Sequence, residues 1–237
     1  MEVKCNALML RAADYKENDK ILTLFAVGKG KITATCRGVK KAAAKLKFAA
    51  QPFCFAEYVL AERAGRYTVT SAFLHDGFYA LREDIKKFYA ASVVLEICNL
   101  LLPEGMESDV LFFFAVQTLG KMCEEDEGLP LVSFLLNALY SAGYTLRLDG
   151  CLHCGKHLSG RGYFNFESGG FYCGECVQEN CAPVSEITYQ TLRAASGEEG
   201  LTITQDGVKR ALRLLKEYFL QKIECKIDAL SEYIRLI

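Results

Sequence analysis

Apolar and polar positions alternate along short segments of the first seventy or so residues. From Lys31 to Val39 the apolar side chains occupy every second position, which is typical of a strand with one buried face. Similar short segments, separated by polar or glycine-containing turns, predict four further strands, at residues 7–10, 21–27, 53–60 and 67–73. Five strands in so short a stretch predict a small closed barrel, and the pattern favours the five-stranded OB-fold.

The apolar period changes to three and four residues from about Leu81. This spacing predicts an amphipathic helix that ends before Pro103. Further segments with the same period predict helices at residues 108–123, 131–142, 185–195, 207–223 and 229–236. We therefore expect an α+β protein with an OB-fold domain at residues 1–80 and a helical domain at 81–237, the latter interrupted by an insert at about 148–180.

The insert contains two Cys-x-x-Cys pairs with eighteen residues between them. Each pair places two thiolates one tight turn apart, and the distance between the pairs is in the range of a four-cysteine zinc site. The intervening glycines suit the positive φ angles of knuckle turns. We expect one structural Zn²⁺, with no position left for water or substrate, bound by Cys151, Cys154, Cys173 and Cys176.

Other interpretations of these cysteines remain open. A redox dithiol, a disulfide pair and buried thiols without a ligand are alternatives, although a thioredoxin-like motif needs only one of the two pairs. A nearby His153, His157 or Cys181 is an alternative ligand in place of one thiolate.

Composition places the chain among intracellular globular proteins. It has 237 residues, of which 51% are hydrophobic, and an odd number of cysteines, eleven. Its first residues lack the apolar core of a signal peptide, and its apolar runs are too short to cross a bilayer. We expect a cytoplasmic protein with reduced cysteines and no membrane contact.

Charge is unevenly distributed along the chain. Residues 1–80 contain 13 Lys and Arg against 7 Asp and Glu, whereas residues 81–237 contain 15 against 22. No acidic residue occurs between Asp19 and Glu57, a stretch that carries eight basic ones. Lysines on a loop neutralise phosphates without reading a base sequence, so the basic loop at 38–51 predicts contact with a polyanion. A loop whose lysines are merely solvated is the alternative.

Two aromatic residues flank the basic loop. Phe48 and Phe53 offer stacking surfaces for unpaired bases if their rings are exposed, and belong to the core if they are not.

The sequence carries no pattern of catalytic residues. Of its three histidines, only His75 lies outside the cysteine-rich insert, next to Asp76 in a polar connection. No phosphate-binding Gly-x-x-x-x-Gly-Lys-Ser/Thr motif and no paired metal-binding carboxylates are present. These observations favour a binding protein over an enzyme.

The order of basic barrel, helices and four-cysteine knuckle resembles the bacterial recombination mediator family RecO. Local matches run through most of the chain. They are Tyr15 to Phe25, Gly38 to Lys41, Gln51 to Phe53, Gly143-Tyr144, Leu148-Asp149, Cys151 to Gly155, and Gly169-Gly170 with Cys173 and Cys176. The tail at 225–237 matches least clearly.

The resemblance implies a non-enzymatic mediator of DNA repair. Such proteins bind single- and double-stranded DNA, anneal complementary strands, engage RecR and the single-stranded-DNA-binding protein, and help to load RecA. On this hypothesis the residues that position the DNA backbone are Lys29, Lys31, Arg37, Lys40, Lys41, Lys45, Lys47, Arg63 and Arg66. Arg210 and Arg213 are candidates for binding the acidic tail of the single-strand-binding protein, with a solvated helix face as the alternative.

Two other functional classes remain open at this point. One is a zinc-ribbon adaptor that binds only protein, and the other is a nucleic-acid enzyme whose active-site residues are dispersed along the sequence.

Overall fold

The structure is a computed structural model that describes residues 2–237. Contacts between residues divide the chain into two compact units, of which the first ends at Glu124 and the second comprises Glu125–Ile237. The three helices that follow the barrel therefore group with the barrel. The domain boundary near residue 80 remains a prediction about which segment folds independently.

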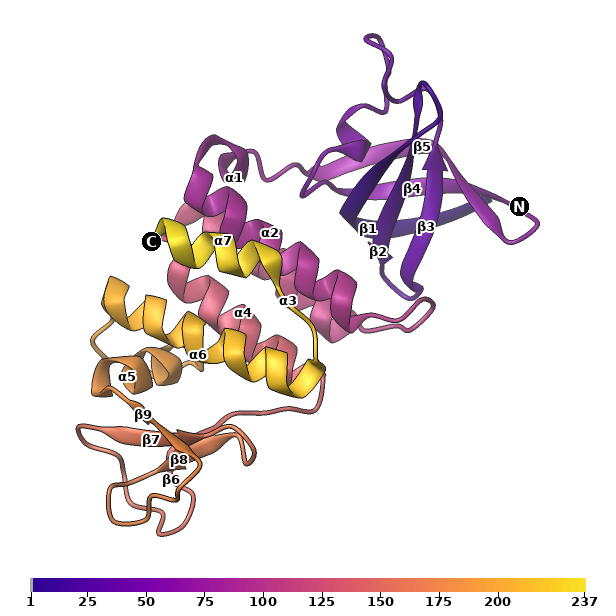
Figure 1. Ribbon diagram of the computed structural model, residues 1–237. Helices are drawn as coiled ribbons and strands as arrows, with labels where there is room; N and C mark the ends of the chain where they lie inside the picture. The colour runs from indigo at the N-terminus through magenta and orange to yellow at the C-terminus, as the bar shows by residue number, and fades with distance from the viewer. Residues whose placement is uncertain (1) are drawn as a thin grey trace. The chain divides into compact units, whose positions relative to one another are not determined.

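Five strands of the first unit form a closed barrel (Figure 1). The strands are β1 (Glu2–Tyr15), β2 (Asp19–Ala26), β3 (Gly30–Cys36), β4 (Phe55–Arg63) and β5 (Arg66–Asp76). Their order around the barrel is β1-β2-β3-β5-β4, with β1 antiparallel to both β2 and β4, and with β3 parallel to β5. This closure confirms the predicted OB-fold.

The apolar positions that alternate along the strands in the sequence are the positions that are buried in the barrel core. Leu22 and Leu24 on β2, and Ala34 and Cys36 on β3, are buried with at most 1% exposure. Burial raises the pKa of Cys36 to about 11, so this thiol acts as a small apolar side chain. Strand β1 is longer than predicted, and an irregularity between Met9 and Arg11 shifts its pairing with β2.

Three helices complete the first unit, together with a short 3₁₀ turn, η1 (Phe48–Ala50). They are α1 (Ala80–Glu83), α2 (Ile85–Leu101) and α3 (Asp109–Glu124). The predicted helix that ends before Pro103 is α2, and it begins at Ile85 because Asp84 adopts an extended backbone and caps it. Its carboxylate accepts hydrogen bonds from the backbone N–H groups of Lys86 and Lys87.

Aromatic side chains join the barrel to these helices. The ring of Phe112 on α3 lies edge-on to Phe25 and Phe55, at centroid distances of 5.2 and 5.8 Å. Phe53 contacts Phe88 on α2 in the same way, at 5.6 Å. These contacts make barrel and helices one packed unit.

The second unit combines four helices with a small sheet. The helices are α4 (Gly128–Ser141), α5 (Glu186–Ala195), α6 (Gln205–Ile223) and α7 (Asp228–Leu236). The sheet has the order β6-β8-β7-β9, from β6 (Arg147–Cys151), β7 (Gly162–Asn165), β8 (Gly170–Tyr172) and β9 (Cys181–Val184). Helix α4 begins three residues before the predicted start, since Pro130 is tolerated in its first turn. Within residues 2–237, no helix is long and apolar enough to cross a bilayer.

The turn between β2 and β3 approaches the segment before α3 closely. Gly28 and Gly30 both have positive φ angles, of 67° and 66°. A Cβ at Gly30 would lie 2.0 Å from the carbonyl oxygen of Met106, whereas a Cβ at Gly28 would meet nothing within 4 Å. Both positions therefore need a positive φ angle, but only Gly28 has space for a side chain.

Replacing either glycine with alanine tests this close approach. The left-handed backbone costs about 1–2 kcal/mol in both variants, and the clash in Gly30→Ala adds a further ~1–3 kcal/mol. Chemical denaturation should show the larger loss of unfolding free energy for Gly30→Ala. Equal losses would contradict the contact with Met106.

Candidate metal centre and nucleic-acid interface

Both Cys-x-x-Cys pairs lie at the same end of the small sheet. Cys151 ends β6 and Cys173 directly follows β8, and these two strands are parallel neighbours. The Sγ atoms of the four cysteines all lie within 4.8 Å of one another, and those of Cys154 and Cys173 are 3.8 Å apart. Sulfurs around a tetrahedral zinc are also about 3.8 Å apart, given Zn–S bonds of ~2.3 Å. The cluster has the spacing of a metal site.

Tight turns present the sulfurs of each pair. Gly155 N–H donates to the Cys151 carbonyl (2.9 Å), and Cys176 N–H donates to the Cys173 carbonyl (3.1 Å). Gly155 has a φ of 71°, which a residue with a Cβ rarely adopts. A solvated ion pair between Lys156 and Glu175 (2.7 Å) joins the two turns. The backbone thus directs both pairs toward one point.

The pKa values of the Cys151 and Cys176 thiols shift in opposite directions. Burial would raise the pKa of Cys151, but backbone N–H groups of Cys154, Cys173 and His153 lower that pKa to about 6. Desolvation, followed by hydrogen bonds with the other thiols, raises the pKa of Cys176 to about 12. These two pKa shifts have opposite signs because negative charge accumulates in the cluster as successive thiols ionise. A bound dication offsets this charge, so the donor set fits a metal.

The alternative ligands are engaged elsewhere or lie outside the cluster. His157 Nε2 lies 3.1 Å from Nη1 of Arg193, and Cys181 Sγ lies 3.8 Å from the amide nitrogen of Asn165. Among residues 2–237, the clustered ligand atoms belong to the four cysteines and to no histidine. All eleven cysteines are free thiols. The set predicted from the sequence is therefore the set that the fold assembles.

The small sheet rests on aromatic side chains of the second unit. The ring centroids of Phe171 on β8 and Tyr189 on α5 are 4.8 Å apart, and those of Phe164 on β7 and Tyr218 on α6 are 5.7 Å apart. Tyr189 also donates its hydroxyl hydrogen to the carbonyl of Leu148 (2.6 Å). A metal bound by the cysteines would therefore also support the packing of the sheet on both helices.

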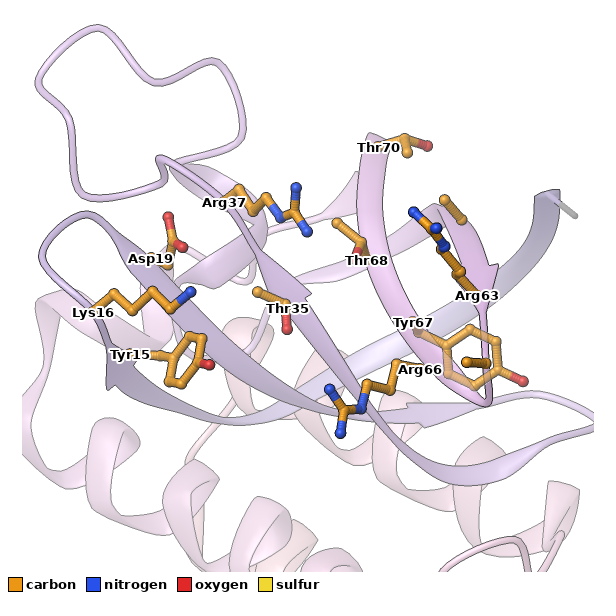
Figure 2. A pocket seen from close by; sticks show the side chains of 12 residues that line it. Tyr15, Lys16, Asp19, Thr35, Arg37, Arg63, Arg66, Tyr67, Thr68 and Thr70 are labelled. Carbon is orange, nitrogen blue, oxygen red and sulfur yellow. The ribbon is translucent and has the colours of Figure 1, made fainter.

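A groove of about 770 Å³ runs across the barrel (Figure 2). We call it the barrel groove. The β1–β2 turn, β3, β5 and the β4–β5 turn supply its lining, which is Tyr15, Lys16, Asp19, Thr35, Arg37, Ala61, Arg63, Ala64, Arg66, Tyr67, Thr68 and Thr70. Figure 2 shows Tyr15 and Lys16 at the left of the groove and Arg63 and Tyr67 at the right. Segments distant in sequence therefore form one surface.

The charge of the barrel groove is predominantly positive. Four basic residues line it and Asp19 is its single acidic residue. Oδ1 of Asp19 already accepts a hydrogen bond from Gly38 N–H (2.8 Å). Within residues 2–237, none of the ion pairs uses Arg37, Arg63 or Arg66. These guanidinium groups are available to an anionic ligand.

Residues 38–51, which we call the lysine loop, emerge from the end of β3 beside the groove. Lys40 forms an ion pair with Asp14 (2.8 Å), and the hydrogen bond from Lys40 lowers the pKa of that carboxyl. Lys41, Lys45 and Lys47 are exposed. A second, smaller cavity of about 380 Å³ lies at the base of the loop, lined by Asp14, Lys20, Val39, Lys40, Lys47, Ala50 and Gln51.

Hydrogen bonds hold the lysine loop at both ends. At its start, Lys40 N–H donates to the Asn18 carbonyl (3.0 Å). At its end, the buried hydroxyl of Tyr58 donates to the Ala49 carbonyl (2.8 Å). The guanidinium of Arg82 donates to the Gln51 side chain and to the Pro52 carbonyl. Both ends of the loop are thus attached to the first unit by hydrogen bonds.

Comparison with known proteins gives matches over nearly the whole chain. The model of the recombination protein O N-terminal domain matches residues 1–78, and that of the C-terminal domain matches residues 82–230. The chain belongs to the recombination protein O (RecO) family. One relative, "DNA repair protein RecO" of Clostridium perfringens, is 28% identical over 99% of this chain and 98% of its own length. Another of that name, from Pelotomaculum thermopropionicum, is 31% identical over 93% of this chain and 89% of its own.

The two RecO matches divide the candidate sites between them. The N-terminal match contains the barrel groove and the lysine loop, and the C-terminal match contains all four cysteines. The resemblance inferred from local motifs is thereby confirmed.

The predicted basic residues do not form one surface. Arg37, Arg63 and Arg66 meet in the barrel groove, and Lys40, Lys41, Lys45 and Lys47 belong to the lysine loop. Lys29 and Lys31 lie at the turn of the β2–β3 hairpin, where Ala26 pairs with Gly30. Arg37 follows the opposite end of the hairpin, where Lys20 pairs with Cys36, six residues away along β2. That separation is about 20 Å. Lys31 Nζ donates to the Asn99 carbonyl (2.8 Å) and so faces α2.

Other candidate residues have different surroundings from those envisaged. Phe53 is fully buried and Phe48 packs against the barrel core, so the core interpretation holds for both. Arg210 and Arg213 are exposed on α6, where Arg210 pairs with Asp206 (2.8 Å).

Of the groove residues that were not candidates from the sequence, Tyr15, Lys16 and Tyr67 are the aromatic and basic ones. Tyr15 and Lys16 precede the acid-free stretch, and Tyr67 reads as an ordinary strand residue. Their position beside the β1–β2 and β4–β5 turns is the available signal, because these turns flank the binding face of an OB-fold.

The metal centre is tested by replacing one ligand. Cys154→Ser should abolish retention of the metal ion, because losing a ligand costs more than the ~10–100-fold typical of changes around the ligands. Elemental analysis of the purified protein measures the metal, and thermal unfolding measures stability. Cys181→Ser is the matched control and should retain the metal. Equal loss in both variants would contradict the four-cysteine site.

The anchoring of the lysine loop is tested by proteolysis. Arg82→Ala removes the hydrogen bonds to Gln51 and Pro52, so trypsin should cleave after Lys41, Lys45 or Lys47 faster than in the unchanged protein. Mass spectrometry of a digestion time course identifies the cleaved bonds. Arg11→Ala, on the exposed surface of β1, is the control. Unchanged cleavage in Arg82→Ala would show that the guanidinium does not hold the loop.

Proposed function

We propose that this RecO family member is a non-enzymatic DNA-binding mediator of recombinational repair in the RecF pathway. It binds single- and double-stranded DNA, anneals complementary strands, and helps to load RecA onto DNA covered by the single-stranded-DNA-binding protein. Its relatives carry the name "DNA repair protein RecO". Family membership supports the biological role, and the chemistry of the barrel supports the DNA contact.

The barrel groove is the observation that carries the proposal. It combines three arginines without ion-pair partners, one lysine and two tyrosines. Guanidinium groups bind phosphates through paired N–H donors, and tyrosine rings stack on unpaired bases without regard to sequence. Hydroxyl groups of Thr35, Thr68 and Thr70 supply further hydrogen-bond donors and acceptors. Such a surface suits a single strand whose bases are exposed.

We further propose that the four cysteines bind one structural zinc ion. Thiolate sulfurs at tetrahedral spacing are the donor set that zinc prefers in closed sites. The ion would supply folding free energy to the β6–β9 sheet. Filling all coordination positions with protein ligands is consistent with a role outside catalysis.

The partners follow from family membership. We propose RecR and the single-stranded-DNA-binding protein as direct partners and RecA as an indirect one. In this scheme the mediator contacts the single-strand-binding protein and the DNA that it covers, so that RecA gains access to the strand.

The groove assignment is tested by a triple variant, Arg37→Ala, Arg63→Ala and Arg66→Ala. Single-stranded DNA should bind more weakly, and the slope of log K against log salt should decrease in magnitude by about 2, at ~0.7 per lost phosphate contact. Fluorescence anisotropy of a labelled oligonucleotide across a salt series measures both quantities.

The matched control removes three exposed basic residues outside the barrel, Lys121, Arg147 and Lys226. This control should bind DNA as the unchanged protein does. A triple groove variant with an unchanged slope would place the DNA elsewhere. Complete absence of salt-dependent DNA binding in the unchanged protein would favour a protein-binding zinc-ribbon adaptor.

A further inference from the structure

The barrel groove and the lysine loop differ in chemistry although they are adjacent. The groove offers tyrosine rings, threonine hydroxyls and guanidinium groups around a cavity of about 770 Å³. The cavity at the base of the loop is half that size, about 380 Å³, and no aromatic side chain lines it. One surface can therefore hold bases and phosphates, and the other can hold phosphates only.

Hydrogen bonds fix the backbone of the lysine loop. Hydrogen bonds from Lys40 N–H, from the Tyr58 hydroxyl and from the Arg82 guanidinium anchor its two ends. Between these anchors, backbone hydrogen bonds link Ala44 to Lys41 and Lys47 to Ala44 (3.1 and 3.3 Å). Successive turns thus hold the lysine side chains in fixed relation to the barrel.

Asp14 helps to define the boundary between the two surfaces. It lines the loop cavity and pairs with Lys40, and Lys20 approaches it at 4.0 Å. Asp19, which lines the groove, accepts its hydrogen bond from Gly38 at the start of the loop. Each of the two surfaces is thus lined by one carboxylate. A single phosphate backbone lying across both surfaces would meet this negative charge.

We propose that the lysine loop is a second nucleic-acid site, which holds the phosphate backbone of another strand while the barrel groove holds the first. The inference rests on the proposed DNA-binding function and adds to it a stoichiometry of two strands per chain. The groove discriminates in favour of single strands because its tyrosines need unpaired bases. The loop accepts single strands and duplexes alike because its lysines contact phosphates only.

Two strands on one chain account physically for annealing. Complementary strands repel each other through their phosphates until base pairs form. Lysines on one surface and arginines on the other neutralise part of this charge and keep both strands within reach. A mediator with a single site would instead need two chains to bring the strands together.

The test counts strands per chain. The zinc-loaded full-length protein is mixed with oligo(dT) and oligo(dC) of different mass, which cannot pair with each other, and native mass spectrometry resolves the complexes. The unchanged protein should form a complex of one chain with two oligonucleotides. Counting per chain separates this complex from a dimer that carries one strand on each copy.

Two variants separate the sites. The loop variant replaces Lys41, Lys45 and Lys47 with alanine, and the groove variant replaces Arg63, Arg66 and Tyr67. The loop variant should lose the second strand while its affinity for the first falls less than about 3-fold. The groove variant should lose affinity for single strands by about 10-fold or more and lose its preference over duplex. The Lys121, Arg147 and Lys226 variant should behave as the unchanged protein.

Parallel loss of both strands in the loop variant would overturn the second site and show one continuous surface. Salt-dependent binding that never exceeds one strand per chain would overturn it while leaving the proposed function intact. Binding of neither strand at low salt would instead overturn the proposed function, and with it this inference.

Discussion

The pairing of β1 with two neighbours is the constraint on which the barrel depends. Its residues 2–8 pair with β4, and its residues from Ala7 to Tyr15 pair with β2, so this strand closes the sheet on itself. Closure fixes where the β1–β2 turn lies relative to the β4–β5 turn. Those turns supply Lys16 on one side of the groove and Arg63 and Arg66 on the other. Backbone hydrogen bonding thus assembles a basic surface from residues about fifty positions apart.

A different principle stabilises the second unit. Its sheet has strands of only three to five residues, too short to form a core of their own. The parallel pairing of β6 with β8 brings the four sulfurs together, and the rings of Phe164 and Phe171 attach the sheet to α5 and α6. The cysteine cluster and the aromatic packing therefore belong to the same small sheet.

Much of this architecture was predictable because it depends on local patterns. The period of apolar residues gave the barrel strands and most helices, and the spacing of Cys151, Cys154, Cys173 and Cys176 gave the cluster. Helix α1 was not predicted separately, because a single helical turn is too short to show an apolar period. The groove was only partly predictable, since Lys16 and Tyr67 meet Arg37 through strand pairing that no local pattern specifies. The contact of Lys31 was not predictable for the same reason, because its partner, the Asn99 carbonyl, is 68 residues away.

Photocrosslinking tests the central claim most directly, namely that the barrel groove holds single-stranded DNA. A 5-bromodeoxyuridine oligonucleotide bound to the zinc-loaded protein is irradiated, and the crosslinked peptides are identified by mass spectrometry. The account predicts crosslinks at Tyr15 or Tyr67, the two rings that line the groove. Crosslinks confined to residues 125–237 would contradict it.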